Sequence, residues 1–356
     1  MDPLTVELYE KYEKENKTKL TNWIMSFSDP VGFKQVGFPI RVSSCNDLHR
    51  YSDTMHENRM RLYFNNMSGL TQDETRILKE VKKARDKVLQ LTNAPNRVYS
   101  LAPILSAIHI ARLIKNRAQK FSRCTIFEVA AGSGFLTCVL ALMGFRVITT
   151  DTTQGFYLFE NHLYHALVGD DLMELATGDY ENVEAGKIIH MPWWHFFTLF
   201  QENRLPSVEI FTCNHALAEM NQFVRNYIIS LAKSLLPNDK GEFILEGWGG
   251  EIMSQEEDVR LEFRNKGFRF ISEWHPSAIL TPSKKTQLID SLIMRKIRNK
   301  FNRFAQKTGF YTSNAIIQNI AKKRDVSNYN KFLSLINVDE EKSPDELLFQ
   351  FISKEH

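Results

Sequence analysis

The chain of 356 residues is 43% hydrophobic and 24% charged, the composition of a globular protein long enough for one large domain with additions. Its formal net charge of +3 is too small to indicate a nucleic-acid partner, and no apolar run approaches the roughly 18 residues that a membrane span needs. Residues 1–19 lack the apolar core of a secretory signal and the four cysteines lack C-x-x-C spacing, so we expect a cytoplasmic protein without disulfides or zinc.

Residues 1–97 are predicted to form a mostly helical N-terminal region. Its clearest helix begins with the capping box Thr71-x-x-Glu74, in which each side chain satisfies a free donor at the helix start. Apolar residues then recur at helical spacing as far as Pro95, which ends the helix. A second predicted helix, near residues 101–117, leads directly into the first strand.

Residues 98–297 alternate between predicted strands and helices, which indicates a largely parallel sheet with helices on both faces. Strands are expected near residues 124–130, 145–150, 187–191, 207–213, 241–246, 268–274 and 288–295. A proline-containing loop, residues 275–287, is expected between the last two strands. Residues 298–356 return to lysine-rich helical sequence and are predicted to be a C-terminal helical extension.

The most informative segment is the turn after the first strand, where residues 128–134 read E-V-A-A-G-S-G. Glycines let the backbone approach a ligand closely, and the helix that follows presents free N–H groups at its start. The second strand ends on Asp151, a carboxylate that suits the two hydroxyls of a ribose. A dinucleotide fingerprint would place a third glycine three residues after Gly134, where this chain has Thr137.

This turn resembles motif I of class I S-adenosylmethionine-dependent methyltransferases, an acidic residue followed by x-G-x-G-x-G, with Ala130 in place of the first glycine. The resemblance implies an α/β fold with a seven-stranded, mostly parallel Rossmann-like sheet that ends in an antiparallel hairpin. It also implies S-adenosyl-L-methionine as the cofactor. Residues implied to line its methionine part are Glu128, Ala130, Gly132 and Gly134. Asp151 would bind the ribose, and Trp193, in the loop after the third strand, would lie against the adenine.

The fourth predicted strand is followed by residues 214–220, N-H-A-L-A-E-M, where this family holds polar residues near the substrate. A hydroxyl nucleophile is weak until its proton is removed, and a histidine suits that task near neutral pH. We predict that His215 is the general base and that Asn214 and Glu219 orient the substrate or the histidine. Glu219 would lie one helical turn from His215 if a helix starts here. Glu246 and Trp248, after the fifth strand, are further candidates for the acceptor pocket.

The loops P-W-W after the third strand and N-H-A-L-A-E-M after the fourth are similar to those of bacterial sugar O-methyltransferases associated with surface polysaccharides. This similarity implies O-methylation of a sugar or another small hydroxyl acceptor. Three alternatives stay open: a methyltransferase acting on protein, RNA or a small amine; a nicotinamide-dependent enzyme; and a non-catalytic binding module. No His, Asp or Glu spacing indicates a metal site. The acceptor, the methylated atom and the oligomeric state are not determined by the sequence.

Overall fold

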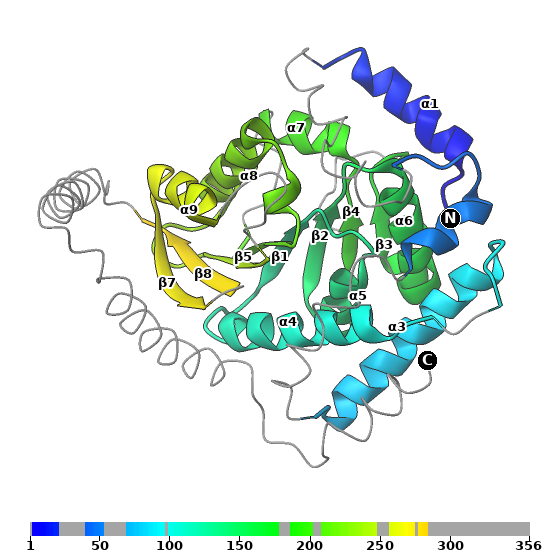
Figure 1. The fold of residues 1–356 in the computed structure, drawn as a ribbon, viewed down its shortest axis with the longest axis horizontal. Coiled ribbons are helices and arrows are strands. Elements are labelled where there is room, and N and C mark those ends of the chain that lie inside the picture. The colour runs from blue at the N-terminus through cyan, green and yellow to red at the C-terminus, as the bar shows by residue number, and fades with distance from the viewer. Residues whose placement is uncertain are drawn as a thin grey trace, which may run out of the picture.

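The computed structural model describes residues 2–20, 40–52, 69–96, 99–177, 186–201, 208–247, 256–274 and 277–283. In these ranges the chain builds one eight-stranded sheet in the order β3-β4-β2-β1-β5-β6-β8-β7. The strands are β1 (Thr125–Val129), β2 (Arg146–Thr150), β3 (Leu172–Glu174), β4 (Ile188–His190), β5 (Ile210–Asn214), β6 (Glu242–Glu246), β7 (Phe268–Trp274) and β8 (Ser277–Pro282). Figure 1 shows the sheet in the middle of the molecule with helices packed around it.

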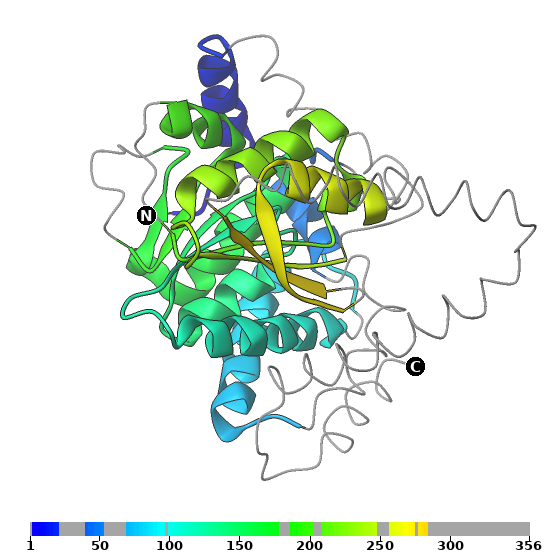
Figure 2. The same cartoon turned by 90° about the vertical axis from the view of Figure 1, so that its left-hand side faces the viewer.

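The sheet is parallel from β3 to β6, and only β8 pairs antiparallel, with β6 and with β7. The central strands β1 and β2 are buried along almost their whole length, as expected for parallel strands covered on both faces. Figure 2 shows helices above and below the sheet. The predicted fold class, a mostly parallel α/β sheet with helices on both faces and a final hairpin, is confirmed.

Two strands differ from the prediction. The sheet has eight strands instead of seven, because the short edge strand β3 pairs with β4; three residues are too few to show a periodic pattern in the sequence. The prediction that residues 288–295 pair with β7 was wrong. The partner of β7 is β8, at residues 277–282, within the segment predicted to be a loop. All six residues of β8 are buried. Antiparallel strands need only a short connection, so β8 can follow β7 almost at once. Residues 288–295 lie outside the described ranges.

Helices cover the sheet, and several of them come before the first strand in the chain. They are α1 (Val6–Lys17), α3 (Gln72–Gln90), α4 (Ala102–Ala118), α5 (Phe135–Leu142), α6 (Gln154–Val168), α7 (Trp193–Gln201), α8 (Gln222–Leu235) and α9 (Glu256–Asn265), with 3-10 turns η3 (Cys45–Tyr51), η4 (Gly169–Asp171) and η5 (Leu217–Glu219). The capping box predicted at Thr71 and Glu74 is present at the start of α3. Helices α4 and α5 lie on the face of the sheet opposite to α8 and α9 (Figures 1 and 2).

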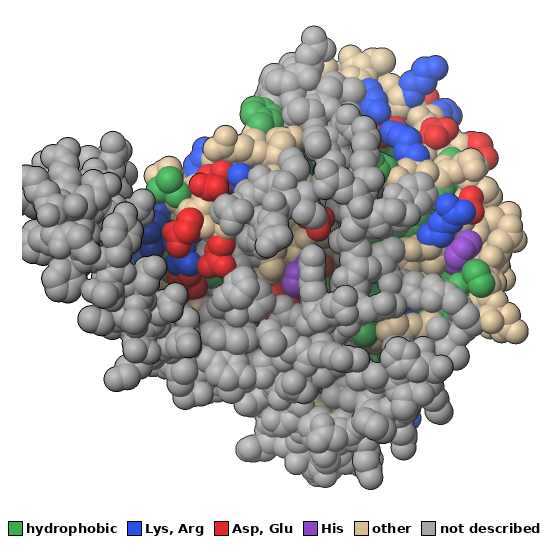
Figure 3. Space-filling model, in the orientation of Figure 1, with side chains coloured by type: hydrophobic (Ala, Val, Ile, Leu, Met, Phe, Trp, Pro, Cys, Tyr) green, Lys and Arg blue, Asp and Glu red, His purple; other side chains and the backbone are tan. Residues whose placement is uncertain are grey.

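The N-terminal elements share one hydrophobic core with the sheet, since side chains of α1, η3 and α3 belong to the same buried cluster as the strands. The division at residues 97 and 297 stays a prediction, and residues 298–356 lie outside the described ranges. None of the helices in the described part is long and apolar enough to cross a membrane. On the face seen in Figure 3, lysine and arginine side chains of the described residues are interspersed with acidic ones.

A buried charged cluster around His190, the last residue of β4, fastens α1 and α6 to the sheet. The His190 ring lies between two carboxylates, with Nδ1 at 2.7 Å from Glu174 and Nε2 at 3.0 Å from Glu160. Asn161 donates to Glu174 at 2.7 Å and accepts from the backbone N–H of Leu4 at 2.7 Å. Burial disfavours the imidazolium, but the two carboxylates outweigh it and raise the pKa of His190 to about 9.

We expect His190→Gln to lower the free energy of unfolding by about 3 kcal/mol, because it leaves buried carboxylates without their cation. The contribution of His190 should be complete below its ordinary pKa of 6.5 and should be lost as the pH rises through about 9. Urea unfolding at several pH values between 6 and 9.5 tests both points. A decline with pH of equal size in the wild type and in His190→Gln would assign the effect to other groups.

Candidate functional site

The turn between β1 and α5 takes a left-handed backbone at three positions: Ala130, Gly132 and Gly134 have φ angles of 57°, 61° and 71°. At Gly134 a side chain has no room, since a Cβ atom would lie 2.6 Å from the Tyr164 hydroxyl. Ala130 adopts the same backbone region at a cost of about 1–2 kcal/mol, which a glycine there would avoid. The turn therefore has the shape of a glycine-rich loop even where one glycine is missing.

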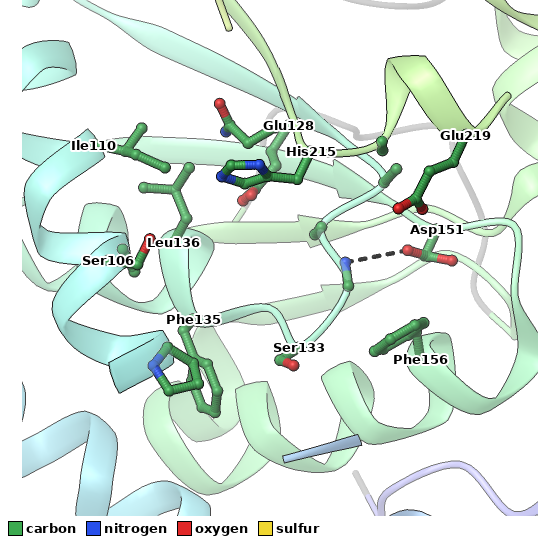
Figure 4. A pocket seen from close by; sticks show the side chains of 17 residues that line it. Ser106, Ile110, Glu128, Ser133, Phe135, Leu136, Asp151, Phe156, His215 and Glu219 are labelled. Atoms are coloured by element: carbon green, nitrogen blue, oxygen red, sulfur yellow. Dashed lines mark hydrogen bonds between the residues drawn. The ribbon is translucent and has the colours of Figure 1, made fainter. Parts of the chain in front are cut away.

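Asp151, the first residue after β2, joins this turn to the neighbouring strand. One oxygen, Oδ2, accepts from the Gly132 N–H at 3.1 Å, the contact drawn in Figure 4. The other, Oδ1, accepts from the backbone N–H of Thr153 at 2.8 Å and from the Thr153 hydroxyl. Burial raises the pKa of Asp151, and these hydrogen bonds oppose the rise. The carboxylate is thus held in one orientation at the carboxyl end of the sheet.

A pocket opens where the carboxyl ends of β1, β2 and β5 meet (Figure 4). About 760 Å³ of space free of protein atoms lies inside it, part of it open to solvent. Helix α4 forms one wall with Ser106 and Ile110, and Phe156 of α6 forms another. Ligands of open α/β sheets bind at this edge, so the position agrees with the topology.

Most residues predicted to bind the cofactor meet at this pocket: Glu128, Ala130, Gly132 and Asp151 line it, and Gly134 caps the start of α5 beside it. Trp193 is not brought to it. The Trp193 side chain is fully buried under α1, where its indole N–H donates to Glu13 at 3.0 Å.

The aromatic side chains that line the pocket are instead Phe135 and Phe156, which the sequence analysis did not single out. Phe156 lies in the first turn of α6, shortly after Asp151. The sequence signal that could have identified Phe156 was its position at the start of the helix that follows Asp151.

The tip of β5 supplies the other side of the pocket with Asn214, His215 and Glu219. His215 has a left-handed backbone, with φ at 56°, and its N–H donates to the Glu246 carbonyl at 2.6 Å. The helical turn assumed between His215 and Glu219 is absent, because only the short 3-10 turn η5 follows. Figure 4 shows the Glu219 carboxylate directed toward Asp151 rather than toward the His215 ring.

The carboxylate that contacts the imidazole is Glu246, at the end of β6: its Oε1 lies 3.2 Å from Nε2 of His215. The other oxygen, Oε2, accepts from Ser277 at 3.0 Å and lies 3.9 Å from Nδ1 of His109. Burial raises the pKa of Glu246, but the hydrogen bond and charge of His215, together with His109 and Ser277, bring that pKa below its ordinary value. The site therefore contains an ionised carboxylate paired with a histidine.

The described residues contain no group of three His, Cys, Asp or Glu side chains placed to hold a metal ion. The motif turn, Asp151 and His215 line one pocket, and Glu246 contacts His215 from outside that lining. Trp248, the other candidate for the acceptor pocket, lies outside the described ranges.

No protein-family model matches this chain, and no curated protein matches it. Among solved structures it is similar to magnesium protoporphyrin IX methyltransferase from Synechocystis with bound SAM, at 14% identity over 60% of this chain and 99% of the other, with a TM-score of 0.34. A TehB-like SAM-dependent methyltransferase from Corynebacterium glutamicum gives 11% identity, 49% and 88% coverage, and a TM-score of 0.37. An O-methyltransferase family protein from Burkholderia thailandensis is 11% identical over 57% of this chain and 63% of the other, with a TM-score of 0.35. The sheet order of this chain, parallel from β3 to β6 with a final antiparallel pair, is that of a Rossmann-like α/β fold.

Proposed function

We propose that this chain is an S-adenosylmethionine-dependent methyltransferase that methylates a hydroxyl group of a sugar or another small acceptor, with His215 as the general base. The observation that carries the proposal is the single pocket that joins the motif turn and Asp151 to the His215–Glu246 pair. A cofactor site alone would fit a binding module, whereas a carboxylate-paired imidazole in the same pocket supplies a group able to remove a proton.

The residues present fit this cofactor. Asp151 lines the pocket, and its three hydrogen bonds leave acceptor capacity on Oδ2 for a ribose hydroxyl. The backbone of Gly132 is open to a ligand, since a Cβ there would meet only Phe156, at 4.0 Å. Phe156 adds an aromatic surface next to Asp151. When bound, S-adenosylmethionine supplies a methyl group activated by a sulfonium.

A dinucleotide fits less well. The third glycine of that fingerprint allows close packing of helix on strand. Here the position holds the fully buried Thr137, whose hydroxyl donates to Glu128 at 2.6 Å. At the start of α6, the N–H of Gly155 is occupied by the Ile40 carbonyl at 3.1 Å, so this donor is not offered to a phosphate.

The contact with Glu246 assigns a role to each nitrogen of His215. A carboxylate accepts the proton on Nε2, which fixes the tautomer in which Nδ1 is the basic nitrogen. The backbone of Gly247 lies against the His215 ring, since a Cβ at Gly247 would lie 2.0 Å from Nδ1. In this proposal the His215 imidazole takes a proton from an acceptor hydroxyl, while Glu246 stabilises the imidazolium that forms.

Calorimetry tests the cofactor assignment. We expect S-adenosylmethionine and its demethylated product to bind with micromolar affinity, and NADH to show no binding under the same conditions. Tight binding of NADH without a response to S-adenosylmethionine would contradict the proposal. A screen of glycans and nucleotide sugars with labelled cofactor, read by mass spectrometry, would then identify the acceptor class.

Gly247→Ala tests the position of the base. We expect turnover to fall by about 10²-fold with cofactor affinity retained, because the new methyl group displaces the His215 ring. Gly144→Ala is the matched control: Gly144 is also left-handed, with φ at 92°, but a Cβ there has nothing within 4 Å. Equal loss of turnover in both variants would point to backbone strain instead of the ring position.

A further inference from the structure

Glu128 is a buried carboxyl group at the floor of the proposed cofactor pocket. It lies near the end of β1, is 3% exposed and lines the cavity (Figure 4). Its carboxyl group accepts hydrogen bonds from Thr137: the hydroxyl donates to Oε2 at 2.6 Å, and the backbone of Thr137 also donates to it. Within the described ranges, no lysine, arginine or histidine forms an ion pair with it, in contrast to Glu246, which has His215. A carboxylate in such a place lacks the charge compensation that buried anions require.

The groups around Glu128 make its ionisation harder. The charge that raises the pKa of Glu128 is that of Asp151, after β2. The other titratable groups coupled to Glu128 are acids whose own pKa values burial raises: Cys138 on α5, Glu160 and Tyr164 on α6, and Cys213 on β5. His215 lines the same pocket, and the described lining contains no lysine or arginine. Burial first, and then the charge of Asp151, raise the pKa of Glu128 to about 8 against the pull of the Thr137 hydrogen bond.

We propose that Glu128 carries a proton in the ligand-free protein and gives it up when a positively charged ligand enters the pocket, so that binding of the cofactor is coupled to release of a proton. The inference rests on the proposed function, since S-adenosylmethionine bears an ammonium and a sulfonium group. No covalent bond of the ligand changes: the O–H bond of Glu128 breaks and the proton passes to the buffer.

The size of the coupling follows from the acid–base balance. At pH 6.5 a carboxyl with a pKa of about 8 is almost fully protonated. A positive charge within about 4–6 Å typically lowers a carboxyl pKa by about 1–3 units, and a shift of about 2–3 units removes most of that proton on binding. Affinity for a cationic ligand should therefore rise between pH 6 and 7.5, by up to about tenfold per pH unit, because less work is needed to ionise Glu128.

Calorimetry on the full chain measures the released proton directly. Titrations of S-adenosylmethionine at pH 6.5 in phosphate and in Tris, which differ in ionisation enthalpy, are expected to show close to one proton released per ligand bound. 5′-Methylthioadenosine, which shares the nucleoside but has neither cationic group, is expected to bind without proton release.

Two variants assign the proton to Glu128. Glu128→Gln keeps the shape and the acceptor for Thr137, and should bind S-adenosylmethionine with release near zero and a flat pH dependence. Thr137→Val removes the donor that favours the ionised carboxylate, and should shift the pH range of release upward. The second variant provides a test even if the first fails to fold.

The failures can be told apart. Binding of S-adenosylmethionine with equal heats in both buffers would overturn this inference and leave the proposed function standing. Undiminished release in Glu128→Gln, or equal release with 5′-methylthioadenosine, would likewise overturn it. Absence of any binding of S-adenosylmethionine would remove both the inference and the proposed function.

Discussion

His215→Asn is expected to reduce methyl transfer by about 10³-fold while S-adenosylmethionine still binds with an affinity close to that of the wild type. A positioned general base typically contributes about 10²–10⁴-fold, and asparagine has no group able to take the proton. The cofactor-side residues Asp151 and Gly132 are linked to each other and not to His215, so their geometry should persist. Calorimetry and a turnover assay on the same preparation separate the two effects.

Glu246→Gln is the companion variant. An amide accepts the His215 N–H less strongly than a carboxylate and cannot balance the imidazolium charge, so we expect turnover to fall by about 10²-fold. The pKa of Glu246 lies below its ordinary value of 4.5, so the carboxylate should remain ionised above about pH 5 and this contribution should not vary at higher pH. Wild-type turnover in His215→Asn would rule out the proposed base, and wild-type turnover in Glu246→Gln would rule out the role of its partner.

Asp151→Ala is expected to weaken binding of S-adenosylmethionine by at least about 100-fold. The change removes a buried carboxylate that would accept from the ribose, and a site built for such a hydrogen bond loses much of its affinity when the bond is lost. It also frees the Gly132 and Thr153 N–H groups, which loosens the turn itself.

Asp170→Ala serves as the control, since Asp170 is an exposed acid in η4 outside the pocket lining. It should bind the cofactor as the wild type does. Melting temperatures and circular dichroism would show whether Asp151→Ala still folds. A folded Asp151→Ala with unchanged affinity would contradict the placement of the cofactor.

Local signals in the sequence identified the features that depend on neighbouring residues. The E-V-A-A-G-S-G segment predicted a glycine-containing turn after the first strand, and the structure has a turn there with positive φ angles at Gly132 and Gly134. The capping box of α3 was confirmed for the same reason, since Thr71 and Glu74 contact each other across one helical turn. The alternation of apolar segments was enough for the fold class and for the first six predicted strands.

Contacts between segments that are far apart in the chain could not be predicted from local sequence patterns. The proline-flanked residues 277–282 resembled a loop, and only pairing with β6 and β7 makes them a buried strand. The Trp193 side chain is of a type that often stacks on ligands, but its indole N–H donates to Glu13, which lies far away along the chain. The roles of the predicted site residues stay predictions, although their positions around the pocket are now defined.

The sequence by itself determined the fold class, six of the strands, the glycine turn and the acidic end of the second strand, because backbone preference and hydrophobic periodicity act over a few residues. The tertiary structure alone decided that Glu246 and not Glu219 contacts His215, and that Glu128 lies in the pocket without a cation beside it. Both arrangements depend on which strands are neighbours in the sheet, because residues far apart in the sequence meet only at the ends of neighbouring strands. The packing of the whole sheet decides which strands these are.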